Sequence, residues 1–234
     1  IDRYYEDCVQ YSNAEKAILT EEFIDGTEFT VDGVKTEDTY VVAAISEKEH
    51  YAYNPNVASR LLFSHENDRY DYDRLRAENA KLITAMGLPF GVTHTEYKYR
   101  DGMFYLIETA ARGGGTKISS DIVKLVSGID SNRLLIDILS GGKGEIIKEP
   151  CHAYAVLGFF DFKPGLVKEV RGVQEALTQP GVHDLGLEVK EGDLLKEAQD
   201  DRSRCGYYIL YADSDAELKQ REQLLKETVK VITE

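Results

Sequence analysis

The chain has 234 residues and a formal net charge of -14, so its surface repels a phosphate backbone or an anionic membrane. No run approaches the roughly 20 apolar residues that a membrane span needs, and neither nucleic acid nor a membrane is an expected partner. The three cysteines, Cys8, Cys151 and Cys205, lie far apart, which argues against a disulfide framework and favours reduced thiols in a cytoplasmic protein.

The first part of the chain alternates strand and helix patterns. In chain order we expect a short helix over 2–13, strands over 17–24, 28–35 and 39–48, a loop over 51–70, a helix over 73–86, strands over 90–99 and 103–109, and helices over 119–126 and 131–139. Gly87 and Pro89 end the helix over 73–86, and Gly141-Gly142 stops the last one.

The character of the sequence changes near residue 145. A long apolar strand over 153–162 follows, then turns, a strand over 206–212 and a closing amphipathic helix over 215–232. We therefore expect two domains, 1–145 and 146–234, the second a small and mainly antiparallel lobe. The predicted fold class is α+β, with an antiparallel sheet and flanking helices.

A hairpin near residue 100 carries two acids, Glu96 and Glu108, on either side of Asp101-Gly102. With a two-residue loop, side-chain alternation would send the two acids to opposite faces. With a three-residue loop that begins at Arg100, they share a face as diagonal neighbours about 7–8 Å apart, and His94 lies across from Glu108. We expect the second arrangement, because glycine suits the third loop position.

Two carboxylates on one face repel each other unless a cation or proton intervenes. Mg²⁺ takes oxygen ligands, usually one or two carboxylates together with phosphate oxygens. Spacing alone also allows an exposed hairpin whose acids are simply solvated.

A glycine loop, Gly113-Gly114-Gly115, follows the second strand and comes directly after Arg112. An Arg fork suits phosphate or carboxylate, and bare glycine amides approach an anion closely. The spacing is not that of a Walker A loop, and a surface Arg beside a glycine turn is an equally simple interpretation.

Near the start, the segment Glu21-Glu22-Phe23-Ile24-Asp25-Gly26-Thr27-Glu28-Phe29-Thr30-Val31 has the form E-x-[FYWL]-[IVL]-x-G-x-E-[FY]-[ST]-V. Together with the acid hairpin and the E-x-A-x-R run from Glu108 to Arg112, it resembles the ATP-grasp superfamily, and among its members the L-amino-acid ligases and the carbamoyl phosphate synthase large chain. The match covers roughly residues 15–142, as three separated motifs in the family's order. The segment from Glu145 onward resembles the accessory lobe of the amino-acid ligases.

The resemblance implies a role for each matching residue. Glu21, Phe23 and the backbone of Glu22 and Ile24 would meet the adenine of ATP, with Phe23 packed inward, and Glu28 would bind the ribose. The resemblance also implies that Glu96 and Glu108 bind Mg²⁺ or Mn²⁺. Arg112, Gly114 and the neighbouring glycines would hold the group that is transferred. Ala110 stands where the family usually has Asn, so one ion would be held more weakly.

The function that the resemblance implies is a carboxylate–amine ligase that works through an acyl phosphate. Its partners would be small carboxylate and amine substrates, amino acids included, and the oligomeric state stays open, a homodimer among the choices. Two alternatives remain: other ATP-grasp chemistry, such as carbamoyl phosphate synthesis or biotin carboxylation, and a non-catalytic nucleotide-binding module.

The motif that links the two ATP-holding lobes normally lies mid-chain, but here it begins near residue 20. We therefore expect the sequence to be the C-terminal part of an enzyme. By itself it should bind MgATP weakly or not at all.

Overall fold

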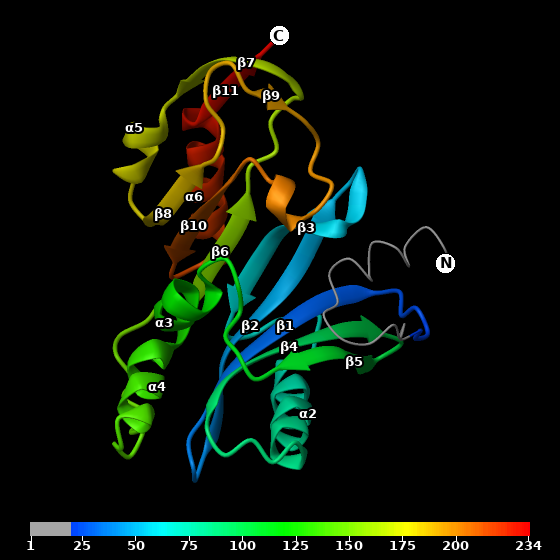
Figure 1. Cartoon of the computed structure of the whole chain (residues 1–234), viewed down its shortest axis with the longest axis vertical. Coiled ribbons are helices and arrows are strands. Elements are labelled where there is room, and N and C mark those ends of the chain that lie inside the picture. Colours follow the sequence, from blue (N-terminus) through cyan, green and yellow to red (C-terminus); the bar gives the residue numbers. More distant parts are fainter. Residues whose placement is uncertain (1–19) are drawn as a thin grey trace.

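The computed structural model describes residues 20–234 (Figure 1). The helix expected over 2–13, and residues 17–19 of the first expected strand, lie outside the described residues. Residues 20–24 form no strand, contrary to the prediction. The acids Glu21, Glu22 and Asp25 are exposed there, so the segment has no face to bury against a sheet. Gly26, at φ +142°, then turns the chain into the first strand.

An eight-stranded sheet forms the body of the described part, and each pair of neighbouring strands is antiparallel (Figure 1). The spatial order is β5-β4-β1-β2-β3-β6-β10-β8. The strands are β1 (Thr27–Lys35), β2 (Tyr40–Tyr51), β3 (Asn54–Ser64), β4 (Gly91–Arg100), β5 (Met103–Ala110), β6 (Tyr154–Phe159), β8 (Val182–Leu187) and β10 (Gly206–Ala212). Strands from before and after residue 145 therefore share one sheet.

Strand β3 occupies the stretch that was expected to be a loop, so that prediction is wrong. The register of β3 against β2 shifts at two places near His50, which disturbs the alternation that reveals a strand in sequence. Val57, Leu61 and Phe63 are buried, and β3 is bonded to β2 on one edge and to β6 on the other. Pairing on both sides, rather than a local signal, makes this segment a strand.

Helix α2 (Tyr72–Ala85) lies against one face of the sheet, close to its predicted position. The Asp71 side chain accepts a hydrogen bond of 2.8 Å from the Arg74 amide and so caps the helix. Tyr72 and Leu75 pack with Phe29, Val31, Ile45 and Tyr97 of the sheet in one buried cluster. On the opposite face, Val34 and Ala44 pack with Ile118, Ile122 and Val123.

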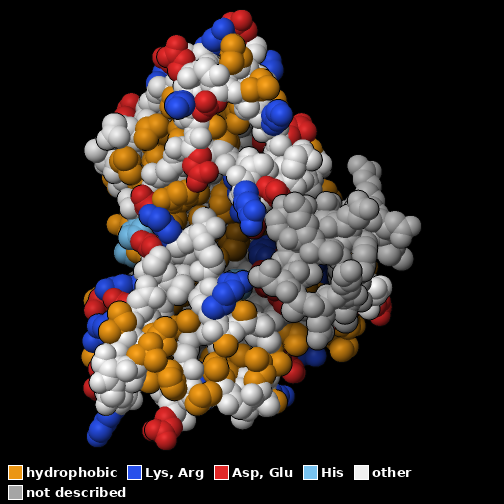
Figure 2. All heavy atoms as spheres, in the orientation of Figure 1, with side chains coloured by type: hydrophobic (Ala, Val, Ile, Leu, Met, Phe, Trp, Pro, Cys, Tyr) orange, Lys and Arg blue, Asp and Glu red, His pale blue; other side chains and the backbone are white. Residues whose placement is uncertain are grey.

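The helix expected over 119–126 is divided into a π-helical turn, η1 (Ile118–Ile122), and α3 (Val123–Ser127). Helix α4 (Ser131–Leu139) has the predicted bounds, and Asp130 caps it by accepting a 2.9 Å bond from the Arg133 amide. Exposed apolar side chains gather over α4 (Figure 2), where Ile136 and Leu139 are 64% and 67% exposed.

The C-terminal part adds a three-stranded sheet of β7 (Gly165–Arg171), β9 (Leu194–Leu195) and β11 (Lys230–Thr233), with helices α5 (Val173–Leu177) and α6 (Asp215–Thr228) and a 3-10 turn η2 (Asp201–Ser203). The closing helix ends at Thr228 rather than at Ile232, because the next residues pair with β7 as a strand. Ser214 caps α6. No helix among residues 20–234 is long and apolar enough to cross a membrane. The predicted fold class, an antiparallel sheet with flanking helices, is confirmed.

Candidate active site

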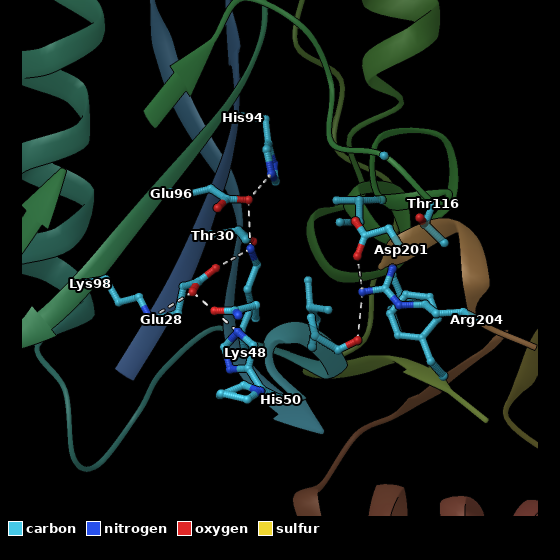
Figure 3. A pocket seen from close by; sticks show the side chains of 18 of the residues that line it. Glu28, Thr30, Lys48, His50, His94, Glu96, Lys98, Thr116, Asp201 and Arg204 are labelled. Carbon is cyan, nitrogen blue, oxygen red and sulfur yellow. Dashed lines mark hydrogen bonds and ion pairs between the residues drawn. The ribbon is translucent and has the colours of Figure 1, made fainter. Parts of the chain in front are cut away.

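A cleft of about 720 Å³ opens over the part of the β1, β2 and β4 face that points away from α2 and carries Glu28, Lys48 and Glu96. Figure 2 shows the surface hollowed between the upper and lower parts of the molecule, with basic side chains beside the hollow. We call one side of the cleft the strand wall, which comprises Glu28, Thr30, Lys48, His94, Glu96 and Lys98. We call the other side the far wall, which comprises Phe159, Asp201 and Arg204. Figure 3 shows the labelled members of the two walls on opposite sides.

Lys48 lies at the centre of the strand wall. Its Nζ donates to Glu28 Oε1 at 2.5 Å and to Glu96 Oε1 at 2.8 Å, so one ammonium bridges two carboxylates (Figure 3). Lys98 approaches Glu28 at 3.1 Å and His50 approaches it at 3.5 Å. The strand register causes this convergence, since Glu28 pairs with Lys48 on one side and with Lys98 on the other.

These contacts shift the protonation equilibria of the strand wall. Burial by itself raises the pKa of Glu28, but hydrogen bonds from His50 and the charge of Lys48 outweigh burial and hold that pKa well below its usual range. Burial likewise opposes the ionised form of Glu96, and bonds from His94 and Lys48 lower its pKa. Both carboxyl groups are therefore ionised at neutral pH.

A second chain of charges runs from Asp32 through His94 to Glu96. His94 Nδ1 lies 2.9 Å from Asp32 Oδ1, and its Nε2 lies 3.4 Å from Glu96 Oε1. Burial lowers the pKa of His94, but the bonds to Asp32 and Glu96 dominate and raise it to about 9. The imidazole is therefore a cation near pH 7 and donates to both acids.

Gly114 closes over this histidine. A methyl group at Gly114 would stand 2.9 Å from both Asp32 Oδ1 and His94 Nδ1, so only glycine fits without displacing the pair. Gly114 itself is buried, whereas Gly115 lines the cleft. The buried Oδ2 of Asp32 has no hydrogen-bond partner in the part of the chain that the structure describes.

The hairpin between β4 and β5 has a two-residue loop, so the expected three-residue loop is wrong. Arg100 pairs with Met103, and Asp101 and Gly102 both have positive φ, at 52° and 80°. A shift of register one residue beyond Tyr97 then brings Glu96 directly opposite Glu108.

The hydroxyls of Thr95 and Thr109, the next pair along the hairpin, lie 2.9 Å apart, which supports the pairing of Glu96 with Glu108 on the other face. The shift also moves His94, which lies across from Ala110 and not, as expected, from Glu108. Glu108 is exposed. Among residues 20–234, no group of three or more His, Cys, Asp or Glu side chains is arranged to hold a metal ion.

Arg112 is exposed and lines the cleft, where its Nη1 donates to the Gly113 carbonyl at 3.0 Å. Thr116 also lines the cleft and adopts a left-handed conformation, with φ at 46°, as does Lys117 at 63°. The loop that carries Arg112 thus bends tightly after its glycines.

Phe23 is 78% exposed and lines the cleft, so the expectation that it packs inward is wrong. No strand holds residues 20–24 against the sheet, so nothing in the backbone pairing draws this ring into the core. Glu21 and Glu22 are exposed and Ile24 is half-buried. Arg100 reaches Glu22 at 3.4 Å, which connects this segment to the hairpin.

The sequence analysis missed cleft residues on both walls, among them Lys48, His50, Lys98 and Arg204, and it missed Asp32 behind His94. Lys48 carried a weak signal, because it stands near the end of an apolar strand that follows the strand with Glu28, and an antiparallel pair of these strands could bring the two charges together. Arg204 carried none, since its approach to the cleft depends on how a C-terminal loop folds back.

Comparison with known protein families shows to which family the chain belongs. The family model described as ATP-grasp domain matches residues 2–121. The chain belongs to the ATP-grasp family. A second model, described as L-amino acid ligase C-terminal domain 2, matches residues 143–234. The family predicted from the three motifs is therefore confirmed.

Two solved structures and one sequence illustrate the similarity of this ATP-grasp chain to known proteins. Phosphoribosylglycinamide synthetase from Anaerococcus prevotii has a TM-score of 0.76 at 18% identity, and L-amino acid ligase from Bacillus licheniformis 0.72 at 20%. Each similarity covers 91% of this chain and 55% of the other. Dapdiamide A synthase from Enterobacter agglomerans is 23% identical over 219 residues, 90% of this chain and 51% of that protein. The chain thus spans about half the length of these relatives.

Proposed function

We propose that this chain forms one side of the ATP site in a ligase that joins a carboxylate to an amine, with amino acids as the substrate class. The observation that carries the proposal is the pairing of Glu96 with Glu108 on the same face of the sheet as Glu28. The kinship with L-amino acid ligases supports the choice of substrate class. We also keep, as a proposal, the division into a domain of residues 1–145 and an accessory domain of residues 146–234.

The strand wall suits a nucleotide with a divalent cation. Lys48 and His94 both approach Oε1 of Glu96, and Oε2 of Glu96 accepts no hydrogen bond within residues 20–234. A free carboxylate oxygen opposite a second carboxylate fits the oxygen ligands of Mg²⁺ or Mn²⁺, so Glu96 and Glu108 would hold the ion. The ion, when bound, offsets negative charge on the phosphates.

The side chains of the cleft then have separate tasks. Glu28, ionised and fixed by Lys48, accepts hydrogen bonds from the ribose hydroxyls. The segment from Glu21 to Ile24 meets the adenine, with the exposed ring of Phe23 offering an apolar surface at the edge of the cleft. Arg112 and the glycine loop hold the transferring phosphoryl group.

The proposed reaction has two steps. The γ-phosphoryl group of ATP passes to the carboxylate of the first substrate, which gives ADP and an acyl phosphate. The amine of the second substrate attacks the acyl carbon, phosphate leaves with the electron pair of the broken C–O bond, and the nitrogen loses a proton. Such chemistry depends mainly on positioning and charge neutralisation, which agrees with the ion-paired cleft.

The test is ADP release by the complete protein with MgATP, screened over single amino acids, amino-acid pairs and bicarbonate. Hydroxylamine added to the reaction traps an acyl phosphate as a hydroxamate. We expect ADP release with amino acids and its loss in Glu96→Gln and Glu108→Gln, while Asp101→Asn, in the exposed turn of the same hairpin, stays active. ADP release with bicarbonate alone, or full activity of both glutamine variants, would overturn the proposal.

A further inference from the structure

Arg204 is a buried cation on the far wall of the cleft. Its side chain is only 9% exposed, although it follows the exposed turn η2. The guanidinium carbon lies 3.7 Å from the centre of the Phe159 ring, and this cation–π contact restricts the orientation of the side chain. Such a restricted orientation is unusual for a side chain with many rotamers and requires an explanation.

The hydrogen bonds of Arg204 are incomplete. Its Nη2 donates to the Ala58 carbonyl at 2.8 Å and meets Asp201 Oδ1 at 2.7 Å. Its Nε is buried and has no partner, and its Nη1 makes no hydrogen bond, among residues 20–234. Arg60, in contrast, pairs its charge with two carboxylates: its guanidinium contacts Glu49 and Glu222 through separate nitrogens.

The charge of Arg204 is also poorly balanced. Its one carboxylate partner in the described part, Asp201, has a side chain that is 77% exposed, and an exposed pair contributes little stabilisation. A buried guanidinium with unused donors favours an added anion. A carboxylate that displaced Asp201 would meet Nη1 and Nη2 along one edge of the fork, which is the planar two-point fit that Arg provides.

We propose that Arg204 binds the carboxylate of the amino acid whose amine attacks in the second step. This assignment rests on the proposed function. The strand wall and Arg112 are already engaged with the nucleotide and the transferring group, so the cation across the cleft is left for the second substrate. The accessory part of the chain would thereby select amino acids over simple amines.

The experiment compares each acceptor amino acid with its primary amide, in which a neutral carboxamide replaces the carboxylate. Assays use the complete protein and the acceptor that gives the most ADP. Arg204→Met keeps an apolar stem over Phe159 and removes the fork, and Arg202→Met, in η2 and exposed, is the matched control. We expect Arg204→Met to raise KM for the amino acid by on the order of 30-fold, the loss typical of an unpaired charged hydrogen bond. KM for the amide should stay within about twofold of the wild-type value, and Arg202→Met should resemble wild type for both acceptors.

A merely structural Arg204 gives a different pattern. The variant would then lose activity equally with the amino acid and the amide, and that result would overturn the proposal. If no acceptor supports ADP release, the proposed function fails, and the role of Arg204 is tested without ATP. Thermal unfolding of the protein is then followed with the twenty amino acids and their amides. Stabilisation that requires a carboxylate and disappears in Arg204→Met supports the proposal, and its absence from wild type overturns it.

Discussion

The two walls of the cleft handle charge in opposite ways. On the strand wall, Lys48 bridges Glu28 and Glu96, and every partner comes from a regular strand. On the far wall, Arg204 stands on an irregular segment with donors left over. Paired strands fix side chains at repeated spacings, so opposite charges can be matched before any ligand arrives. The loop supplies a cation whose one carboxylate partner in residues 20–234, Asp201, is exposed, and donors of the guanidinium are left for a ligand.

The largest expected effect concerns Lys48, the central cation of the strand wall. Lys48→Met leaves Glu28 and Glu96 partly buried without their shared partner, which should lower the free energy of unfolding by about 3 kcal/mol. Urea unfolding measures the change, with Lys81→Met on the exposed side of α2 as the control. Adding Glu28→Gln to Lys48→Met should recover part of the loss. A cost below about 0.5 kcal/mol, the level of an ordinary surface change, would mean that the strand wall is not a coupled charge cluster.

The next effect is a dependence of stability on pH through His94. Its pKa of about 9 in the folded protein lies above the usual value of about 6.5, so the protonated ring stabilises the fold fully below about pH 6.5. That contribution is lost as pH rises through about 9, and we expect a fall of about 2–3 kcal/mol across this window. His94→Asn should abolish the fall.

Chemical unfolding at a series of pH values measures the His94 effect. His152→Asn, which leaves the strand wall intact, serves as the control. If the stability of His94→Asn changed with pH as the wild type does, protonation of His94 would not contribute to the stability of the fold.

Substitution of Gly114 should have a smaller effect on stability, and the neighbouring Gly115 provides a matched control. Gly114→Ala places a methyl group 2.9 Å from Asp32 and His94, and overpacking of this kind costs about 1–2 kcal/mol. Gly115→Ala meets nothing within 4 Å in residues 20–234 and should be nearly neutral. The two thermal midpoints, compared directly, test whether the glycine loop rests on the strand wall. Equal midpoints would show that the loop moves freely above the histidine.

The smallest effect belongs to the far wall. A double-mutant cycle of Phe159→Leu with Arg204→Met should give a coupling of about 0.5–1 kcal/mol, the range for a cation over an aromatic face. Phe160→Leu, whose ring stacks on Phe162, is the control for lost core volume. A coupling energy of about 3 kcal/mol, the loss expected for Lys48→Met, would contradict the proposed difference between the two walls.

The sequence was sufficient where a local pattern had one meaning. The family followed from three motifs in order, and the bounds of α2, β4, β5 and α4 followed from periodicity, caps and glycine stops. The hairpin shows the limit of such reasoning. The shared face of Glu96 and Glu108 was expected for a reason that proved wrong, because a shift of register rather than a third loop residue brings them together.

Only the tertiary structure decided the rest. Strand β3 exists because β2 and β6 bond to both of its edges, and Lys48 bridges two acids because three strands align in a single register. Arg204 reaches the cleft because a segment more than a hundred residues beyond β4 folds back over β6. A sequence records which residues are adjacent along the chain and which faces of an element are apolar. Contacts between distant strands and loops depend on the packing of the whole sheet, and no local pattern encodes them.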